Sequence, residues 1–161
     1  MRHVLIIGAG RSASSLIRYL LSKSNEENLH ITVADLSLSL AEAKTHNHPN
    51  ATPLALNIFD TDERRNAIES ASIVISMLPA HLHIEIAKDC IELKKHLVTA
   101  SYISEAMQAL DTDAKQNNLI FMNEIGLDPG IDHMSAMKVI DEIRSKGGKM
   151  LLFESFCGGL V

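Results

Sequence analysis

Short apolar runs alternate with longer helical patterns along this chain, and this alternation constrains the fold more than any other feature. The runs are rich in β-branched residues and lack polar alternation, which is typical of strands covered on both faces. The expected strands are Val4–Ile7, Ile31–Ala34, Ala55–Asn57, Ile73–Ser76, Leu97–Ala100 and Leu119–Met122. The expected helices between them are Ser14–Ser22, Leu38–Thr45, Asp62–Ser70, Leu82–Lys94 and Glu105–Gln116. This order predicts an α/β fold with a doubly wound, mostly parallel sheet of six core strands.

Composition excludes several classes of protein. The 161 residues are 46% hydrophobic and 22% charged, as in ordinary globular domains. The formal net charge of −5 gives no reason to expect a nucleic-acid partner. The apolar runs are too short to span a bilayer, and no secretory leader is recognisable, so we expect a cytoplasmic protein without a membrane partner. Two cysteines do not suggest a disulfide scaffold.

A glycine-rich turn joins the first expected strand to the first expected helix. Residues 8–13 read GAGRSA and match the pattern G-x-G-x-x-A. Gly8 permits the tight turn, Gly10 lets the backbone approach a pyrophosphate, and Ala13 allows close helix packing. The helix start adds unpaired N–H groups and the positive end of a dipole. With the six strands, this turn predicts a Rossmann dinucleotide-binding domain.

Asp35 ends the second expected strand, at about the distance from the turn where such folds place a ribose-binding carboxylate. A carboxylate accepts from a 2′-hydroxyl and repels a 2′-phosphate, so Asp35 favours NAD over NADP. Arg11, just past the turn, could instead meet a 2′-phosphate. The alternative is that Asp35 only caps the helix that follows Ser37.

The segment 123–133, NEIGLDPGIDH, follows the last expected strand directly. Open α/β sheets bind ligands beyond the carboxyl ends of their strands, so we expect this loop at the binding site. Asp128 precedes Pro129–Gly130, a strong turn sequence, and either serves the site or caps its own turn. Asn123 and Glu124 are candidates to brace the loop. Tyr102, after the fifth strand, is either a hydrogen-bond donor in the site or a half-buried aromatic.

The last stretch suggests that the chain continues into another domain. Asp132–Lys146 has apolar residues on one side of a helix, and glycines at 147 and 148 end it. Lys149–Phe156 then resembles a strand. We therefore expect a dinucleotide-binding domain over 1–148 and, over 149–161, the first strand of a substrate or dimerisation domain that is missing here.

The histidines give no metal-site prediction. His46 and His48, like His81 and His83, are two residues apart and on a helix would not face one site. Neither pair has a cysteine or acidic partner at a metal-ligand spacing. His81 could line the cofactor cleft. Cys90 has helical spacing with apolar neighbours and is expected in the core.

Four segments carry a resemblance to a known family. They are Ile75–Pro79, Thr99–Ile103, Asn123–His133 and Phe156–Gly159. Over Val4–Gly159 the chain resembles the saccharopine dehydrogenase family, most closely its glutamate-forming branch, also called saccharopine reductase. The resemblance implies an oxidoreductase of lysine metabolism, with NAD or NADP as cofactor. It would transfer a hydride between the cofactor and the secondary amine of saccharopine, giving glutamate and 2-aminoadipate 6-semialdehyde through an imine.

The resemblance also implies site residues. Cofactor contacts, beside Gly8 and Asp35, would be Ala9, Gly10, Arg11, Ser12, Asn57, Ile58, Leu78, Ala100, Ser101, Leu127, Asp128 and Pro129. Substrate contacts would be Ser101, Tyr102, Asp128, Cys157 and Gly158. Asp128 and Tyr102 are the expected catalytic residues, acting by substrate positioning. The chain departs from the family at Leu36, where members that use NADP usually have arginine, and at Arg11–Ser12, where an aromatic–valine pair is common.

Two alternatives remain open at the level of the sequence. A related dehydrogenase of a carboxylated polyamine would use the same domain, and a cofactor-sensing module without catalysis would use the same turn. The polar residues at three strand ends favour an enzyme, because a sensor needs no polar substrate floor. On this view the chain alone binds cofactor but is inactive, and a homodimer could form through the missing domain.

Overall fold

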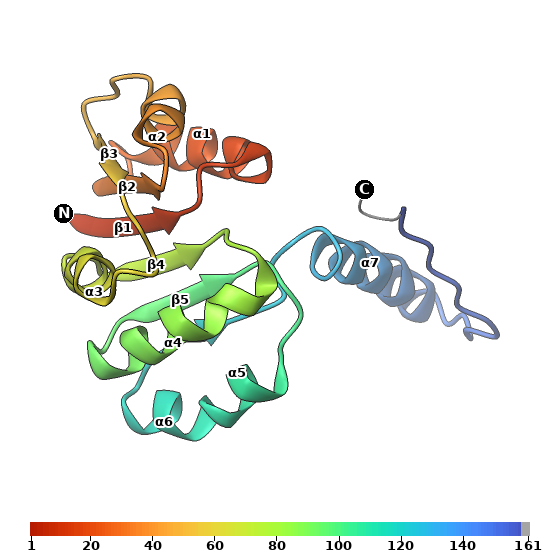
Figure 1. The fold of residues 1–161 in the computed structure, drawn as a ribbon. Helices are drawn as coiled ribbons and strands as arrows, with labels where there is room; N and C mark the ends of the chain where they lie inside the picture. The colour runs from red at the N-terminus through yellow and green to blue at the C-terminus, as the bar shows by residue number, and fades with distance from the viewer. Residues whose placement is uncertain (159–161) are drawn as a thin grey trace.

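A six-stranded parallel sheet organises the computed structural model, which describes residues 1–158 (Figure 1). Its strand order is β3-β2-β1-β4-β5-β6, and each neighbouring pair is parallel. The strands are β1 (Arg2–Ile7), β2 (Leu29–Asp35), β3 (Ala51–Ala55), β4 (Ile73–Ser76), β5 (His96–Thr99) and β6 (Phe121–Met122). This is the doubly wound order of dinucleotide-binding domains, so the fold prediction is confirmed.

The helices cover both faces of the sheet. They are η1 (Arg11–Ala13), α1 (Ser14–Lys23), α2 (Leu38–Thr45), α3 (Thr61–Glu69), η2 (Ala80–Leu82), α4 (His83–Glu92), α5 (Glu105–Ala109), α6 (Asp111–Gln116) and α7 (Ile131–Ser145). Alternate β1 side chains serve opposite faces, as the pleat requires. Val4 and Ile6 pack with Ile17 of α1, whereas Leu5 packs with Ile86 of α4. Two apolar cores therefore fix the sheet between the helix layers.

Two elements differ from their expected ranges. The third strand is β3, Ala51–Ala55, and not Ala55–Asn57. It contains Pro53, which has no N–H to donate and is tolerated here because β3 lies at the edge of the sheet. The helix expected over Glu105–Gln116 is divided at Leu110 into α5 and α6.

The C-terminal segment stands apart from the sheet. Figure 1 shows α7 leading away from the strand ends, with the following residues running back beside it. No α7 residue is buried. The strand expected over Lys149–Phe156 is not formed, because within residues 1–158 no other strand pairs with this segment. The remainder of the expected stretch, 159–161, lies outside the described residues.

Candidate functional site at the carboxyl edge of the sheet

The turn after β1 has the backbone that its glycines predict. Gly8 has a φ of +108°, and a Cβ there would lie 3.0 Å from the carbonyl oxygen of Met77. Gly10 begins the η1 turn, and a Cβ there would meet nothing within 4 Å. Gly8 therefore holds the turn against the end of β4, while the backbone at Gly10 is open to an approaching ligand. The neighbouring Arg11 and Ser12 are exposed.

Asp35 ties the turn to the end of β2. Its Oδ2 accepts a hydrogen bond from the backbone N–H of Ala9 at 2.8 Å, and its Oδ1 accepts from the N–H of Ser37 at 2.9 Å. Sequence reasoning offered ribose binding or helix capping, and it did not anticipate the bond to Ala9. The Asp35 carboxylate thus holds the glycine turn against the end of β2, a structural role beside the two roles that the sequence predicted.

Tyr102, Asp128 and Cys157 meet beyond the ends of β5 and β6. The Tyr102 hydroxyl donates to Oδ1 of Asp128 at 2.5 Å, and this bond raises the pKa of Tyr102 to about 12. The Asp128 carboxylate also raises the pKa of the Cys157 thiol above its usual value. Both groups therefore keep their protons at neutral pH. The structure brings together three expected site residues that are far apart in the sequence.

The loop that presents Asp128 is closed by its own backbone. Gly126 donates its N–H to the carbonyl of Pro129 at 2.8 Å, and Ile131 donates to the carbonyl of Gly126 at 3.0 Å. Gly130 has a φ of +144°, and a Cβ there would lie 2.2 Å from the Gly126 oxygen. The loop therefore requires glycine at 130.

The start of the same loop is braced against β5. Asn123 accepts a hydrogen bond from the Thr99 hydroxyl at 2.8 Å, and Glu124 accepts from the backbone N–H of Ile103 at 3.0 Å. These bonds match the bracing role expected for the two residues. They also join the loop after β5, which carries Tyr102, to the loop that carries Asp128. The positions of Tyr102 and Asp128 relative to each other are thereby fixed.

Sequence reasoning missed the role of His83, which is hydrogen-bonded to the side chain of Ser101. Its Nδ1 lies 2.8 Å from Oγ of Ser76, and its Nε2 lies 2.9 Å from Oγ of Ser101. The side chain is only 3% exposed. Burial, and then the charge of His81, lowers the pKa of His83. The sequence favoured His81 for the cleft, but His81 is exposed on η2, and nothing local in the sequence shows which of the two histidines points inward.

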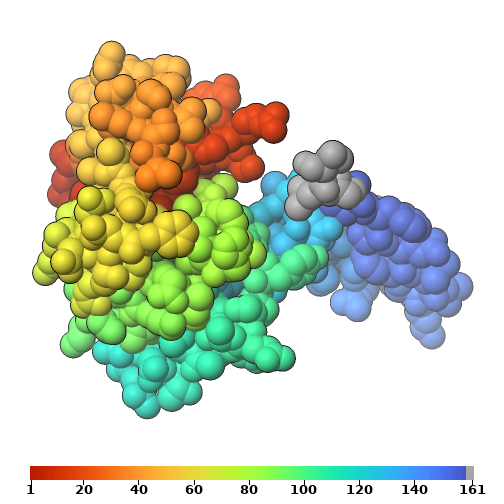
Figure 2. Space-filling model, viewed as in Figure 1, coloured from red at the N-terminus to blue at the C-terminus, as the bar shows by residue number. Residues whose placement is uncertain are grey.

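The remaining predicted contacts lie along the loops of the same edge but form no hydrogen-bonded cluster. Ile58 and Leu78 pack on the core, and the Asn57 side chain accepts from the N–H of Phe59 at 3.1 Å. Leu127 and Gly158 are exposed, Ala100 is half-buried and Pro129 is buried. Figure 2 shows the surface indented between the sheet domain and the α7 segment, which is the side that these loops face.

Outside this edge, residues 1–158 show neither a metal centre nor a reactive thiol. Within residues 1–158, no three His, Cys, Asp or Glu side chains are grouped so as to hold a metal ion. In the same range, none of the helices has the length and apolar character needed to cross a membrane. Cys90 is buried, and burial raises the pKa of its thiol to about 12, as expected for a core residue.

The strand order, the open glycine turn and the polar cluster beside it define a Rossmann-type dinucleotide-binding domain. The saccharopine dehydrogenase NADP binding domain model matches residues 4–122, and the saccharopine dehydrogenase C-terminal domain model matches residues 126–161. The chain belongs to the saccharopine dehydrogenase family.

Similar proteins support this assignment. The glutamate-forming, NADP(+) saccharopine dehydrogenase of Schizosaccharomyces pombe is 40% identical over 160 residues, which is 99% of this chain and 35% of that protein. The alpha-aminoadipic semialdehyde synthase of Arabidopsis thaliana is 37% identical over 98% of this chain and 16% of its own length. The apo saccharopine dehydrogenase structure from Saccharomyces cerevisiae has a TM-score of 0.77 and 34% identity, covering 91% of this chain and 32% of that one. The chain thus spans about a third or less of these relatives.

The comparisons do not favour the NAD preference that Asp35 predicts. The matching family model and the fungal relatives carry NADP in their descriptions. The bonds from Asp35 to two backbone N–H groups give its presence a structural reason that does not involve a ribose.

Proposed function

We propose that this chain is the cofactor-binding part of a glutamate-forming saccharopine dehydrogenase, an oxidoreductase acting on a CH–NH bond. The observation that carries the proposal is the cluster of Tyr102, Asp128 and Cys157. It lies at the same carboxyl edge of the sheet as the glycine turn, where doubly wound domains bind ligands. The names of the fungal relatives support this substrate.

The residues present fit a dinucleotide. The open backbone at Gly10 gives a pyrophosphate room to approach, and the η1 turn leading into α1 presents the positive end of a helix dipole. The nicotinamide would then extend toward the loops at Leu78, Ser101 and Leu127. When bound, the cofactor accepts or donates the hydride, which no protein side chain can do.

In the proposed oxidation, the carbon beside the secondary amine loses a hydride and the nitrogen loses a proton, so that a C=N bond forms. Water then adds to the imine carbon, and the C–N bond breaks to release glutamate and the semialdehyde. The carboxylate of Asp128 is placed to accept from the substrate nitrogen or from this water. Tyr102, which stays protonated at neutral pH, orients that carboxylate by donating to it. Ser101, held by His83, offers a further hydroxyl.

The decisive assay uses the full-length protein that contains this chain, with saccharopine and either cofactor. We expect cofactor reduction, and we expect Asp128→Asn to lower kcat about 100-fold with little change in cofactor affinity. The matched control is Asp113→Asn, the same substitution at an exposed position on α6. If the wild-type protein binds cofactor but reduces none with saccharopine, the proposal fails. A carboxylated polyamine substrate and a sensing module would then be the readings to test.

We also propose NADP as the cofactor, on the strength of the relatives' names. Asp35 is the residue that opposes this choice, because its carboxylate would repel a 2′-phosphate. Dissociation constants for NADPH and NADH can be measured by fluorescence titration of the wild-type chain and of Asp35→Asn. NADPH should bind more tightly, and Asp35→Asn should improve NADPH alone. Tighter binding of NADH by the wild type would return the assignment to NAD.

For the domain organisation, we propose that residues 149–161 lead into a substrate or dimerisation domain, where the 149–156 segment gains a strand partner. Two observations support this. Met150, Leu152 and Phe153 lie with α7 around a shared cavity, and α7 buries nothing against the sheet. Because the C-terminal family model begins at residue 126, α7 itself is a candidate for the second domain. Solution scattering of the full-length protein would test both this domain organisation and the proposed homodimer.

A further inference from the structure

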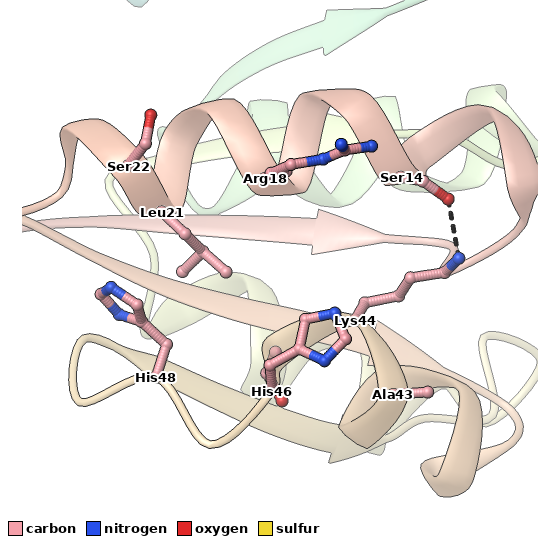
Figure 3. Close-up of a pocket in the computed structure, with 9 residues that line it drawn as sticks. Ser14, Arg18, Leu21, Ser22, Ala43, Lys44, His46 and His48 are labelled. Carbon is pink, nitrogen blue, oxygen red and sulfur yellow. Dashed lines mark hydrogen bonds between the residues drawn. The ribbon is translucent and has the colours of Figure 1, made fainter.

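A second cavity, away from the substrate cluster, lies between α1 and α2 (Figure 3). Its volume is about 580 Å³, and nine residues line it. Four of them carry basic side chains, namely Arg18, Lys44, His46 and His48, and none of the nine is acidic. In a chain whose net charge is −5, this local excess of basic groups is unusual.

Lys44 is the centre of this basic cavity. Its ammonium group donates to Oγ of Ser14 at 2.7 Å, and its side chain spans the gap from α2 to the start of α1 (Figure 3). Within residues 1–158, no carboxylate lies within 4.0 Å of the charged groups of Lys44 or Arg18. An ammonium has three donors, and only one is used here. A half-buried cation without a counter-charge favours an anionic ligand, which would offset its lost hydration.

The two ends of the cavity differ in electrostatics. At one end, Ser14 begins α1, whose dipole favours an anion, and Figure 3 shows the charged groups of Arg18 and Lys44 lying toward this end. At the other end, the last carbonyl groups of α2 disfavour an anion. There Leu21 supplies apolar surface, and His48, whose Nδ1 accepts from the N–H of Asn50, has Nε2 as its donor when neutral. A ligand with its negative charge toward Ser14 and an uncharged group toward His48 would match these two ends.

We propose that Ser14, Arg18 and Lys44 form an anion site that takes a phosphate group. The guanidinium fork and the ammonium are the side chains that proteins use to bind phosphate. Two sources share this chemistry: a free phosphate or phosphomonoester, and the 2′-phosphate of a dinucleotide in the neighbouring glycine turn. The second source rests on the proposed function and would explain how NADP binds despite Asp35.

The test titrates the chain with inorganic phosphate at constant ionic strength, following backbone amide NMR shifts of Ser14 and Lys44. We expect saturable binding that Lys44→Gln and Arg18→Gln each weaken about tenfold, the loss expected for one charge-assisted hydrogen bond. Lys138→Gln, which changes an exposed lysine on α7, is the matched control. Absence of saturable binding, or equal weakening by all three variants, overturns the proposal.

The same variants separate the two sources. Phosphate binding that persists when the chain is saturated with NADP identifies a free anion as the ligand. Competition by NADP, together with a Lys44→Gln loss of affinity for NADPH but not for NADH, identifies the cofactor's phosphate. If neither cofactor binds the wild-type chain, the proposed function fails, yet the phosphate titration still decides the anion site.

Discussion

At the scale of single residues, one neighbouring carboxylate sets the protonation state of the site residues. The carboxylate of Asp128 accepts a hydrogen bond from the Tyr102 hydroxyl and raises the pKa of both Tyr102 and Cys157, so both stay protonated at neutral pH. The sequence identified these three residues through a family resemblance. It did not indicate that Tyr102 donates to Asp128, because this hydrogen bond depends on two loops that only the sheet brings together.

The bond to Asp128 predicts a late titration of Tyr102. The chain has two tyrosines, so a Tyr19→Phe variant leaves one. Its phenolate absorbance should rise near pH 12 and not near 10, since ionisation must break the hydrogen bond. Asp128→Asn should move the titration to lower pH. An unchanged titration in that variant would show that Asp128 is not the partner.

Glycine substitutions should separate folding from binding. Gly130→Ala should lower the free energy of unfolding by about 1–3 kcal/mol or more, because the residue has positive φ and its new Cβ would meet the Gly126 oxygen. Gly10→Ala meets no atom within 4 Å, so it should leave stability nearly unchanged while weakening dinucleotide binding. Urea unfolding and cofactor titration measure the two effects. Equal stability of both variants would contradict the assigned roles.

Pairs of elements are joined by contacts that no local pattern announces. A buried ion pair links α3 to α4, with Nε of Arg64 at 2.6 Å from Oδ2 of Asp89. Arg64 also donates to the carbonyl of Ile58 at 2.6 Å, and both charged side chains are less than 10% exposed. The sequence analysis made no prediction for this arginine or this aspartate, because their pairing depends on how the two helices pack. Similarly, the predicted range of β3 was wrong. Pro53 argues against a strand there unless that strand is known to lie at the edge of the sheet, and only the structure shows that it does.

Breaking this ion pair should be strongly destabilising. Asp89→Ala leaves the Arg64 guanidinium buried without its main counter-charge, so the free energy of unfolding should fall by about 3–5 kcal/mol. The double variant Arg64→Met/Asp89→Leu should lose less, because it removes both charges and fills their space. Chemical denaturation of the two variants provides the measurement. A double variant less stable than Asp89→Ala would show that the pair itself stabilises the fold.

The whole molecule should respond to pH through its buried imidazole. His83 has a lowered pKa in the folded state, so its neutral form is preferred there. Its contribution to stability is therefore present above the unfolded pKa of about 6.5 and is lost as the pH falls through the folded value. The pKa of His30 is also lowered, by burial and by the charge of His3, so His30 should act in the same direction.

Urea unfolding at pH 7.5 and pH 5.5 tests this response. The wild-type chain should be less stable at the lower pH, and His83→Asn should reduce the difference because it removes one titrating group. His133→Asn, which changes an exposed histidine on α7, is the control. An identical pH dependence in wild type and His83→Asn would show that the buried imidazole is not responsible.

The sequence by itself determined the doubly wound class of the sheet, the glycine turn and the loop at its carboxyl edge. These depend on local properties: apolar periodicity, and backbone angles that only glycine adopts easily at Gly8 and Gly130. The tertiary structure decided which residues meet. The Ser76–His83–Ser101 chain, the bond from Asp35 to Ala9 and the basic cavity between α1 and α2 join residues distant along the chain. Their partners are set by the packing of helices on the sheet, and the local sequence does not show which distant residues that packing brings together.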